Sequence, residues 1–229
     1  GFALIPFSRL PKDSDDKPQD NLISKGYDEL KKVWSEVKKE KNIKSFLFSF
    51  FFYSAGVQTV IFLAAIFAKK ELNFQTAELI TVILILQVVA IGGAYLFAKI
   101  SDKKGNIYSL IAMLIIWTAI CLFAYFVTES WQFYSLAAGV GLVMGGIQSL
   151  SRSTYSKLLP DETEDTTSYF SFYDILEKMA IVIGTFSFGF IEQLTGGMRN
   201  SVLALAVFFI IGLLVLLSVK IQPASVESN

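Results

Sequence analysis

Long apolar stretches dominate the sequence, and shorter polar stretches separate them. Six of the apolar stretches are each close to the roughly 20 residues that a helix needs to cross a bilayer. They lie at residues 46–68, 79–98, 107–127, 133–150, 168–191 and 201–219. The pattern therefore predicts an all-α membrane protein, with a bundle of six transmembrane helices over residues 45–220.

A different pattern precedes the first apolar stretch. Apolar residues recur at helical spacing over residues 21–44, with lysines around them: Ile23, Tyr27, Leu30, Trp34 and Val37. This predicts a basic amphipathic helix that lies at the cytoplasmic membrane surface. Simple electrostatic anchoring and specific recognition of lipid headgroups both fit this pattern, and anchoring is the commoner case.

The two ends of the chain contain no further complete span. Residues 1–20 join a short apolar segment to a polar segment rich in Pro and Asp, so we interpret them as the end of a preceding helix and a linker. Residues 221–229 form a short polar tail. The first residue is Gly1 and no signal-peptide pattern follows it, so we expect the sequence to begin partway through a longer polypeptide.

The distribution of basic residues predicts the orientation. Arg9 and the lysines before the first span share one side with Arg152 and Lys157, whereas Lys69, Lys70 and Arg199 fall on the other. Basic residues concentrate on the cytoplasmic side of membrane proteins. Both termini are therefore expected in the cytoplasm.

Composition narrows the chemistry. The chain is 53% hydrophobic, has a mean hydropathy of +0.53, contains no histidine and has a single cysteine, Cys121. These counts exclude a Cys/His zinc site and an intrachain disulfide. No nucleophile–base or metal-ligand pattern appears, so we expect neither an enzyme, nor a metal or other cofactor, nor a nucleic-acid partner.

The fifth apolar stretch carries three charges near its middle. Asp174, Glu177 and Lys178 fall in one arc of a helix, and Asp174 and Lys178 are spaced to form an ion pair that leaves Glu177 without a cation. Charges at this depth are costly and are usually functional. The candidate roles are a substrate or proton-coupling site and, alternatively, an ion-pair network that fixes helix orientation.

Two cytoplasmic turns carry further candidates. Asp102 precedes Gly105 in a tight turn, where its carboxylate could cap the next helix or pair with a base from a neighbouring helix. Arg152 follows the fourth span, where snorkelling to headgroups and a gating pair with a carboxylate are both open. Within that span Gly141 and Gly145 form a GxxxG pair that favours close helix packing.

The spans also differ in polarity. The first and fifth carry many polar residues and the fourth is rich in glycine, whereas the third and sixth are almost uniformly apolar. The first, fourth and fifth spans are therefore expected in the interior, and the third and sixth facing lipid. A repeat of three helices followed by three helices predicts such a pattern.

Four segments resemble a known family: FFYSAGVQTVIF (residues 51–62), SDKKG (101–105), GGIQSLSRSTYSKLLP (145–160) and FSFYDILEKMA (170–180). They are similar to the vacuolar amino-acid effluxers linked to autophagy and their bacterial relatives, a branch of the major facilitator superfamily. SDKKG resembles the second copy of that superfamily's cytoplasmic loop motif, with Asn106 where a basic residue is usual. In the first span, Ala55 occupies a position where relatives often have an acid.

The resemblance implies that the six spans are the C-terminal half of a twelve-helix transporter that works by alternating access. It places the first and fourth helices of this half at the solute cavity and the second and fifth against the missing N-terminal six-helix half. The predicted solute contacts are Tyr53, Ser54, Gln58 and Gln148. Asp174, Glu177 and Lys178 are the predicted charge relay or interdomain switch, and Asp102 and Arg152 the predicted cytoplasmic gate.

The leading hypothesis is thus an effluxer of amino acids or similar solutes in the bacterial plasma membrane, with protons as candidate coupling ions. The alternative is a membrane scaffold or sensor that transports nothing, whose buried charges only set helix packing.

Overall fold

The computed structural model describes residues 22–160 and 166–220, with side chains from residue 26 onward. The described residues form seven helices and no strand. Their bounds are α2 Leu22–Val37, α3 Lys41–Leu72, α4 Thr76–Lys104, α5 Asn106–Ala124, α6 Ser130–Leu158, α7 Thr166–Thr195 and α8 Met198–Leu216. The expected segments at 1–20 and 221–229 lie outside the described residues.

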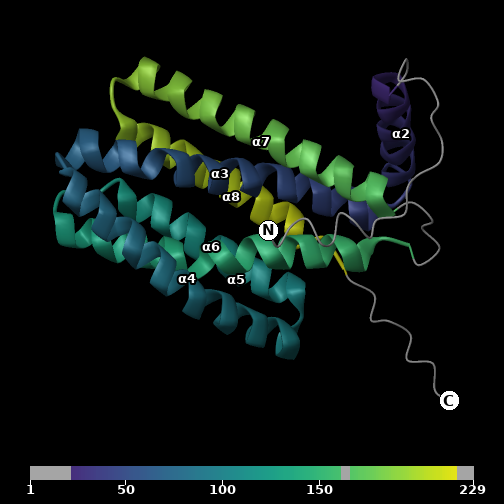
Figure 1. The fold of residues 1–229 in the computed structure, drawn as a ribbon, viewed down its shortest axis with the longest axis horizontal. Coiled ribbons are helices and arrows are strands. Elements are labelled where there is room, and N and C mark those ends of the chain that lie inside the picture. Colours follow the sequence, from purple (N-terminus) through teal and green to yellow (C-terminus); the bar gives the residue numbers. More distant parts are fainter. Residues whose placement is uncertain (1–21, 161–165, 221–229) are drawn as a thin grey trace, which may run out of the picture.

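Six of the helices form one elongated bundle, and α2 crosses its end at a steep angle (Figure 1). Successive helices α3 to α8 alternate in direction along the bundle (Figure 1). We call the end where α3, α5 and α7 begin the α2 end, and the other the far end. Each of the six predicted spans falls on one helix, so the positions of the six helices were predicted correctly and their bounds differ.

Five of these helices, α3, α4, α5, α6 and α8, are long and apolar enough to cross a membrane. The chain is therefore an all-helical, multi-pass membrane protein. Helix α7 is also long, at 30 residues. Its charged residues, however, place it outside the group of five, so the prediction of six spans is supported for five helices.

The bounds of α2 correct the predicted amphipathic helix. The helix was predicted over residues 21–44, but it ends at Val37, and α3 begins at Lys41. Glu40 lies between them with extended backbone angles, φ −92° and ψ 102°. This short break lets α2 lie across the bundle while α3 runs along it.

Small residues let pairs of helices approach closely. Gly141 and Gly145 of α6 face α4, and a Cβ added to Gly141 would lie 2.7 Å from the carbonyl oxygen of Leu86. The close packing predicted for this glycine pair is confirmed. Gly184 of α7 packs in the same way against the backbone of Ala55 in α3. Any larger side chain at these crossings would push the helices apart.

Helices α5 and α8, which were expected to face lipid, are each exposed on only one side and buried on the other. Trp117 of α5 and Phe209 of α8 are fully buried and stack with their ring centroids 5.3 Å apart. The opposite sides expose residues such as Phe123 and Leu214. Uniformly apolar composition could not distinguish the two sides, because protein interior and lipid both favour apolar side chains.

Candidate functional site

A polar cavity of about 300 Å³ opens between α3, α6 and α7. We call it the polar cavity, and its lining residues are Phe50, Tyr53, Ser54, Val57, Gln58, Ile147, Gln148, Ser149, Ser151, Arg152, Tyr173 and Glu177. The lining thus includes all four predicted solute contacts. Along α3 it extends from about 14 Å to about 26 Å beyond Lys41, at 1.5 Å per residue. The cavity therefore reaches from the half of the bundle nearer the α2 end, which we call the α2 half, toward the middle of the bundle; the other half is the far half.

Tyr53 links two of the three helices that form the cavity wall, α3 and α6. Its hydroxyl lies 2.7 Å from the hydroxyl oxygen of Ser151 on α6. Ser151 donates its own hydrogen to the carbonyl oxygen of Ile147, so Tyr53 is the donor toward Ser151. Because the Tyr53 side chain is buried, it shapes the cavity wall more than it offers a free polar group.

Gln58 and Glu177 form the deepest polar pair of the cavity. The side-chain Nε2 of Gln58 donates to Oε1 of Glu177 at 2.8 Å, which joins α3 to α7. Glu177 has no cationic partner among the described residues, as expected from the sequence. Its carboxylate is therefore held by a neutral donor and lines the space that a solute could enter.

Arg152 and Asp174 form an ion pair at the edge of the cavity. Nη1 of Arg152 lies 3.2 Å from Oδ1 of Asp174, and both side chains are about half exposed. The guanidinium also lies over the ring of Phe170, 5.0 Å from its centroid. Of the two predicted alternatives for Arg152, the structure therefore shows the pair with a carboxylate, and that pair joins α6 to α7.

The predicted partner of Asp174 was Lys178, and the structure does not form that pair. Asp174 is bonded to Arg152, whose longer side chain reaches it from the neighbouring helix. Lys178 is exposed and makes no hydrogen bond or ion pair with the described residues. Spacing along one helix identified a pair that was geometrically allowed, but a residue from another helix was the better partner.

Asp102 is likewise exposed and forms neither a cap nor an ion pair within the described part of the chain. Of the two predicted gate residues, only Arg152 therefore has a partner. Gly105, after Asp102, has φ 89°, which fits the reversal expected there.

Asn106 is a residue whose role the sequence did not reveal. It is buried, its side-chain oxygen accepts from Ser101 at 2.7 Å and from Nζ of Lys157 at 3.0 Å, and its amide donates to Ser153 at 3.2 Å. These bonds join the turn after α4 to α6. Asn106 occupies the position where the similar loop motif usually has a basic residue. Here the positive charge near that position comes from Lys157, which is distant in the sequence.

Tyr173 was also missed, although it lines the cavity beside Glu177. Its ring stacks on Phe50 with centroids 4.1 Å apart and on Tyr155 at 5.1 Å. The available signal in the sequence was an aromatic residue directly before Asp174, the first charged residue of α7. Aromatic residues are so frequent in this chain that this signal was weak.

The lining can hold a small molecule that has both polar and apolar parts. Glu177 can accept from a cationic group, the amide of Gln148 can donate or accept, and Arg152 stands at the edge where it can meet an anionic group. Phe50, Val57 and Ile147 supply apolar walls. Among the described residues, no group of three or more His, Cys, Asp or Glu side chains could hold a metal ion.

Comparison with known proteins identifies the family. The sequence profile of the family described as "Vacuole effluxer Atg22 like" matches residues 1–229. The chain belongs to this family. The resemblance seen in the four sequence segments is therefore confirmed, and the family is one of transporters rather than enzymes.

Relatives of this Atg22-like chain occur in bacteria and fungi. The MFS-type transporter YxiO of Bacillus subtilis is 28% identical over 200 residues, covering 87% of this chain and 46% of YxiO. Autophagy-related protein 22 of Eremothecium gossypii is 28% identical, covering 82% of this chain and 39% of that protein. The protein of the same name from Saccharomyces cerevisiae is 27% identical, covering 88% of this chain and 39% of that protein.

The Atg22-like chain thus spans less than half the length of each of these three relatives. No solved structure matches it.

Proposed function

We propose that this chain is the C-terminal half of a twelve-helix secondary transporter, which exports a small solute such as an amino acid by alternating access. The observation that carries the proposal is the polar cavity, because a bundle of apolar helices keeps charged and amide side chains at this depth mainly for function. Membership of an effluxer family and the relatives' names support the same conclusion.

The arrangement of the helices supports a repeat of three plus three. If α3, α4 and α5 correspond to α6, α7 and α8, every major packing contact among these six helices has a counterpart or corresponds to itself. Helix α4 packs on α6 as α7 packs on α3, and α3 packs on α8 as α6 packs on α5. The pairs α4–α5 and α7–α8 also correspond. Such internal symmetry is typical of half-transporters of this superfamily.

Exposure of α4 and α7 supports a missing partner half. These corresponding helices have the fewest buried residues for their length among the six bundle helices. Large apolar side chains such as Ile91 and Tyr95 of α4 are more than two-thirds exposed. The second and fifth helices of the bundle are where the proposed fold places the contact with the N-terminal six-helix half.

An amino acid fits the chemistry of the lining. Its ammonium group would meet Glu177, and its carboxylate would meet Arg152 or the amide of Gln148. Ser54 and Gln58 would supply further hydrogen bonds from α3. Tyr53 remains part of the proposed solute site, where its role is to hold α3 against α6.

Helix α7 provides the proposed coupling between solute and movement. Glu177 lies in the cavity, Asp174 lies at its edge, and Lys178 lies outside it. A proton or a cationic solute at Glu177 would weaken its bond to Gln58 and loosen α7 from α3. Release of Asp174 by Arg152 would free α7 from α6, so we assign the cytoplasmic gate to this pair, with Asp102 as a further candidate.

We propose further that the α2 end faces the cytoplasm of a bacterial cell, with both termini on that side and the bundle in the plasma membrane. Basic residues at the α2 end, including Lys99 and Lys103, support this orientation. The polar cavity would then accept solute from the cytoplasm, which is the direction that an exporter requires.

The alternative is a scaffold in which Arg152–Asp174 and Gln58–Glu177 only fix helix packing, and a flux assay separates the two. Full-length protein in proteoliposomes is expected to move amino acids, and Asp174→Asn to reduce that flux by about tenfold or more, since a charge-assisted hydrogen bond is lost. Lys178→Met is the matched test of the relay.

If wild-type flux across a panel of amino acids, with and without a pH gradient, equals that of empty vesicles, the transporter proposal fails. If Asp174→Asn and Lys178→Met both keep wild-type flux while transport itself is real, only the relay and switch fail. Unfolding curves for each variant show whether a lost flux reflects a lost fold.

A further inference from the structure

Helix α2 has two chemically different sides. Val33 and Val37 are buried against the bundle, whereas the lysines on the other side, and the two that follow the helix, are all exposed: Lys31, Lys32, Lys38 and Lys39. Between these sides runs an edge formed by Tyr27 and Trp34, which are seven residues apart and therefore nearly in line along the helix. Tyr27 is 67% exposed and Trp34 43% exposed.

Contacts with α7 fix how this helix is turned. The hydroxyl of Tyr169 donates to Oε2 of Glu36 at 2.7 Å, and the ring of Trp34 stacks on Phe172 with centroids 5.8 Å apart. Phe172 lies almost one turn further into the bundle than Tyr169. The aromatic edge of α2 is therefore on its membrane side, and the acid Glu36 is turned away from Lys31 and Lys38.

The aromatic edge continues the outward face of α7. Phe172 begins a stripe at helical spacing whose later members are exposed apolar residues: Ile175, Met179, Ile183, Phe186 and Phe190. Trp34 stacks on Phe172 and so extends this stripe at the α2 end. Trp and Tyr side chains concentrate at the level of lipid headgroups, where an apolar surface meets water.

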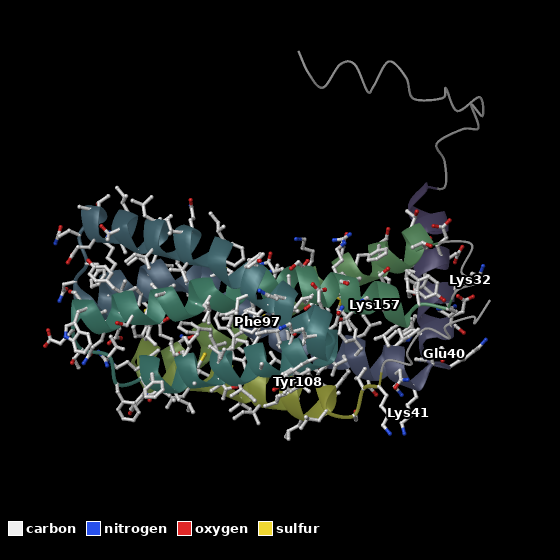
Figure 2. The ribbon with its side chains drawn as sticks, turned by 90° about the horizontal axis from the view of Figure 1, so that it is seen from below. Lys32, Glu40, Lys41, Phe97, Tyr108 and Lys157 are labelled. Carbon is white, nitrogen blue, oxygen red and sulfur yellow. The ribbon has the colours of Figure 1, made fainter. Side chains whose placement is uncertain are left out.

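Two of the lysines flank that edge. By helical geometry Lys31 and Lys38 are the lysines nearest to Tyr27 and Trp34. The ammonium group of Lys38 lies 4.9 Å from the centroid of the Trp34 ring. Lys32, by contrast, points away from the bundle (Figure 2). Lys31 and Lys38 thus present positive charge where phospholipid headgroups would lie beside α7.

We propose that an edge formed by Tyr27, Lys31 and Trp34 of α2, with Lys38 directly after the helix, binds anionic phospholipid headgroups at the membrane surface. Lys31 and Lys38 carry the complementary charge, and the aromatic side chains suit the interface. The adjoining apolar stripe lies on a different side of α7 from Asp174 and Lys178, so the edge is placed at the bilayer rather than in water. Glu36 and Trp34 of α2 contact the start of α7. Bound lipid would therefore also stabilise the position of α7, the helix that carries Asp174 and Glu177.

Hydrogen–deuterium exchange of full-length protein in vesicles tests this binding. Wild-type protein is compared in pure phosphatidylcholine and in vesicles with about 30 mol% phosphatidylglycerol, an anionic lipid. The backbone of residues 26–37 is expected to exchange more slowly in the anionic vesicles, by up to about 30-fold, because two lysines each gain about fivefold near such a surface. Exchange in α5 serves as the internal reference for the fold.

The double variant Lys31→Gln/Lys38→Gln is expected to lose this difference between the two lipids. Lys99→Gln/Lys103→Gln removes the same charge from the same end of the bundle, outside α2, and is expected to keep it. The proposal is overturned if wild-type α2 exchanges equally in both vesicles, as it would if the missing half covered this edge. Equal loss in the two double variants would overturn it as well, since only the overall charge would then matter.

Discussion

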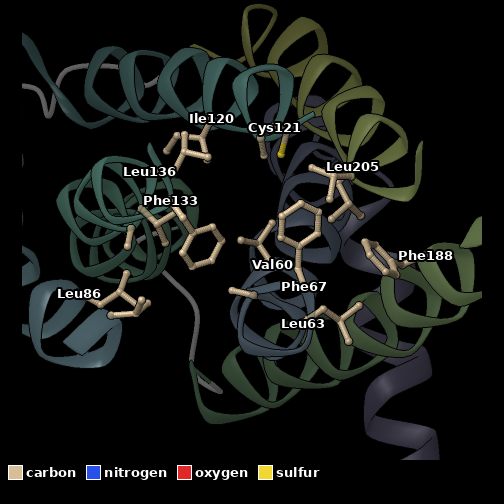
Figure 3. Close-up of a pocket in the computed structure, with 16 residues that line it drawn as sticks. Val60, Leu63, Phe67, Leu86, Ile120, Cys121, Phe133, Leu136, Phe188 and Leu205 are labelled. Carbon is tan, nitrogen blue, oxygen red and sulfur yellow. The ribbon is translucent and has the colours of Figure 1, made fainter. Parts of the chain in front are cut away.

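The two halves of the bundle enclose two cavities of opposite character. Near the far end, a cavity of about 70 Å³ is lined by apolar side chains from all six helices, including Phe67, Phe133 and Phe188 (Figure 3). The polar cavity of the α2 half is larger and is lined by charged and amide groups. The far half thus has an apolar interior that suits helix packing, and the proposed function assigns the entry of a solute to the half nearer the α2 end.

Charged contacts at the far end reinforce the same division. Arg199 bonds Glu71 at 3.0 Å and the carbonyl oxygen of Tyr125 at 2.9 Å, which ties the ends of α3 and α5 to the start of α8. Lys70 and Glu192 join α3 to α7. At the α2 end, the link between α6 and α7 is the pair Arg152–Asp174, whose side chains are 55% and 47% exposed. The side chains of Arg199 and Glu71 are only 27% and 22% exposed, so water reaches the Arg152–Asp174 pair more easily.

Phe133→Ala should have the largest effect on the far half. Phe133 packs edge-on against Phe74 and stacks on Phe67, so its removal enlarges an apolar cavity and is expected to lower the free energy of unfolding by about 3 kcal/mol or more. Phe126→Ala is the matched control, because Phe126 is exposed and its loss should cost about 0.5 kcal/mol or less. Unfolding in mixed micelles measures both. Equal losses would mean that the far half is not the stabilising core.

Thiol labelling compares the two cavities directly. In a Cys121→Ala background, Gln148→Cys is expected to react with a charged, water-soluble thiol reagent about 100-fold faster than Cys121 does in the wild-type protein, because reaction needs an accessible thiolate. Gln148 is exposed in the polar cavity, whereas Cys121 is buried beside the apolar one. Similar rates would show that the two cavities are equally wet, and the distinction between the halves would be wrong.

Apolar patterning was enough to predict the six helices of the bundle, and the four residues named as solute contacts line one cavity. Tyr53, Gln58 and Gln148 could be grouped because the resemblance placed the first and fourth helices together. The hydrogen-bonded and ion pairs between these side chains could not be predicted, because they depend on which neighbouring helix supplies the closer group. Thus Asp174 forms its ion pair with Arg152 and not with Lys178.

The side of α5 that faces the core was hidden for a different reason. Trp117 and Phe123 are both aromatic, yet the first is buried and the second is exposed. In a membrane protein both environments are apolar, so the contrast that marks the core of a water-soluble protein is missing. Only polar residues carry that information here, and α5 has few.

The central claim is that Glu177 in the polar cavity serves transport, and one paired flux measurement tests it. Glu177→Gln and Glu192→Gln make the same chemical change on α7, one in the polar cavity and one at the far end. In proteoliposomes of the full-length protein, Glu177→Gln is expected to lower amino-acid flux by about tenfold or more, while Glu192→Gln stays near the wild-type rate. Equal flux in the two variants, with both folded, would contradict the account.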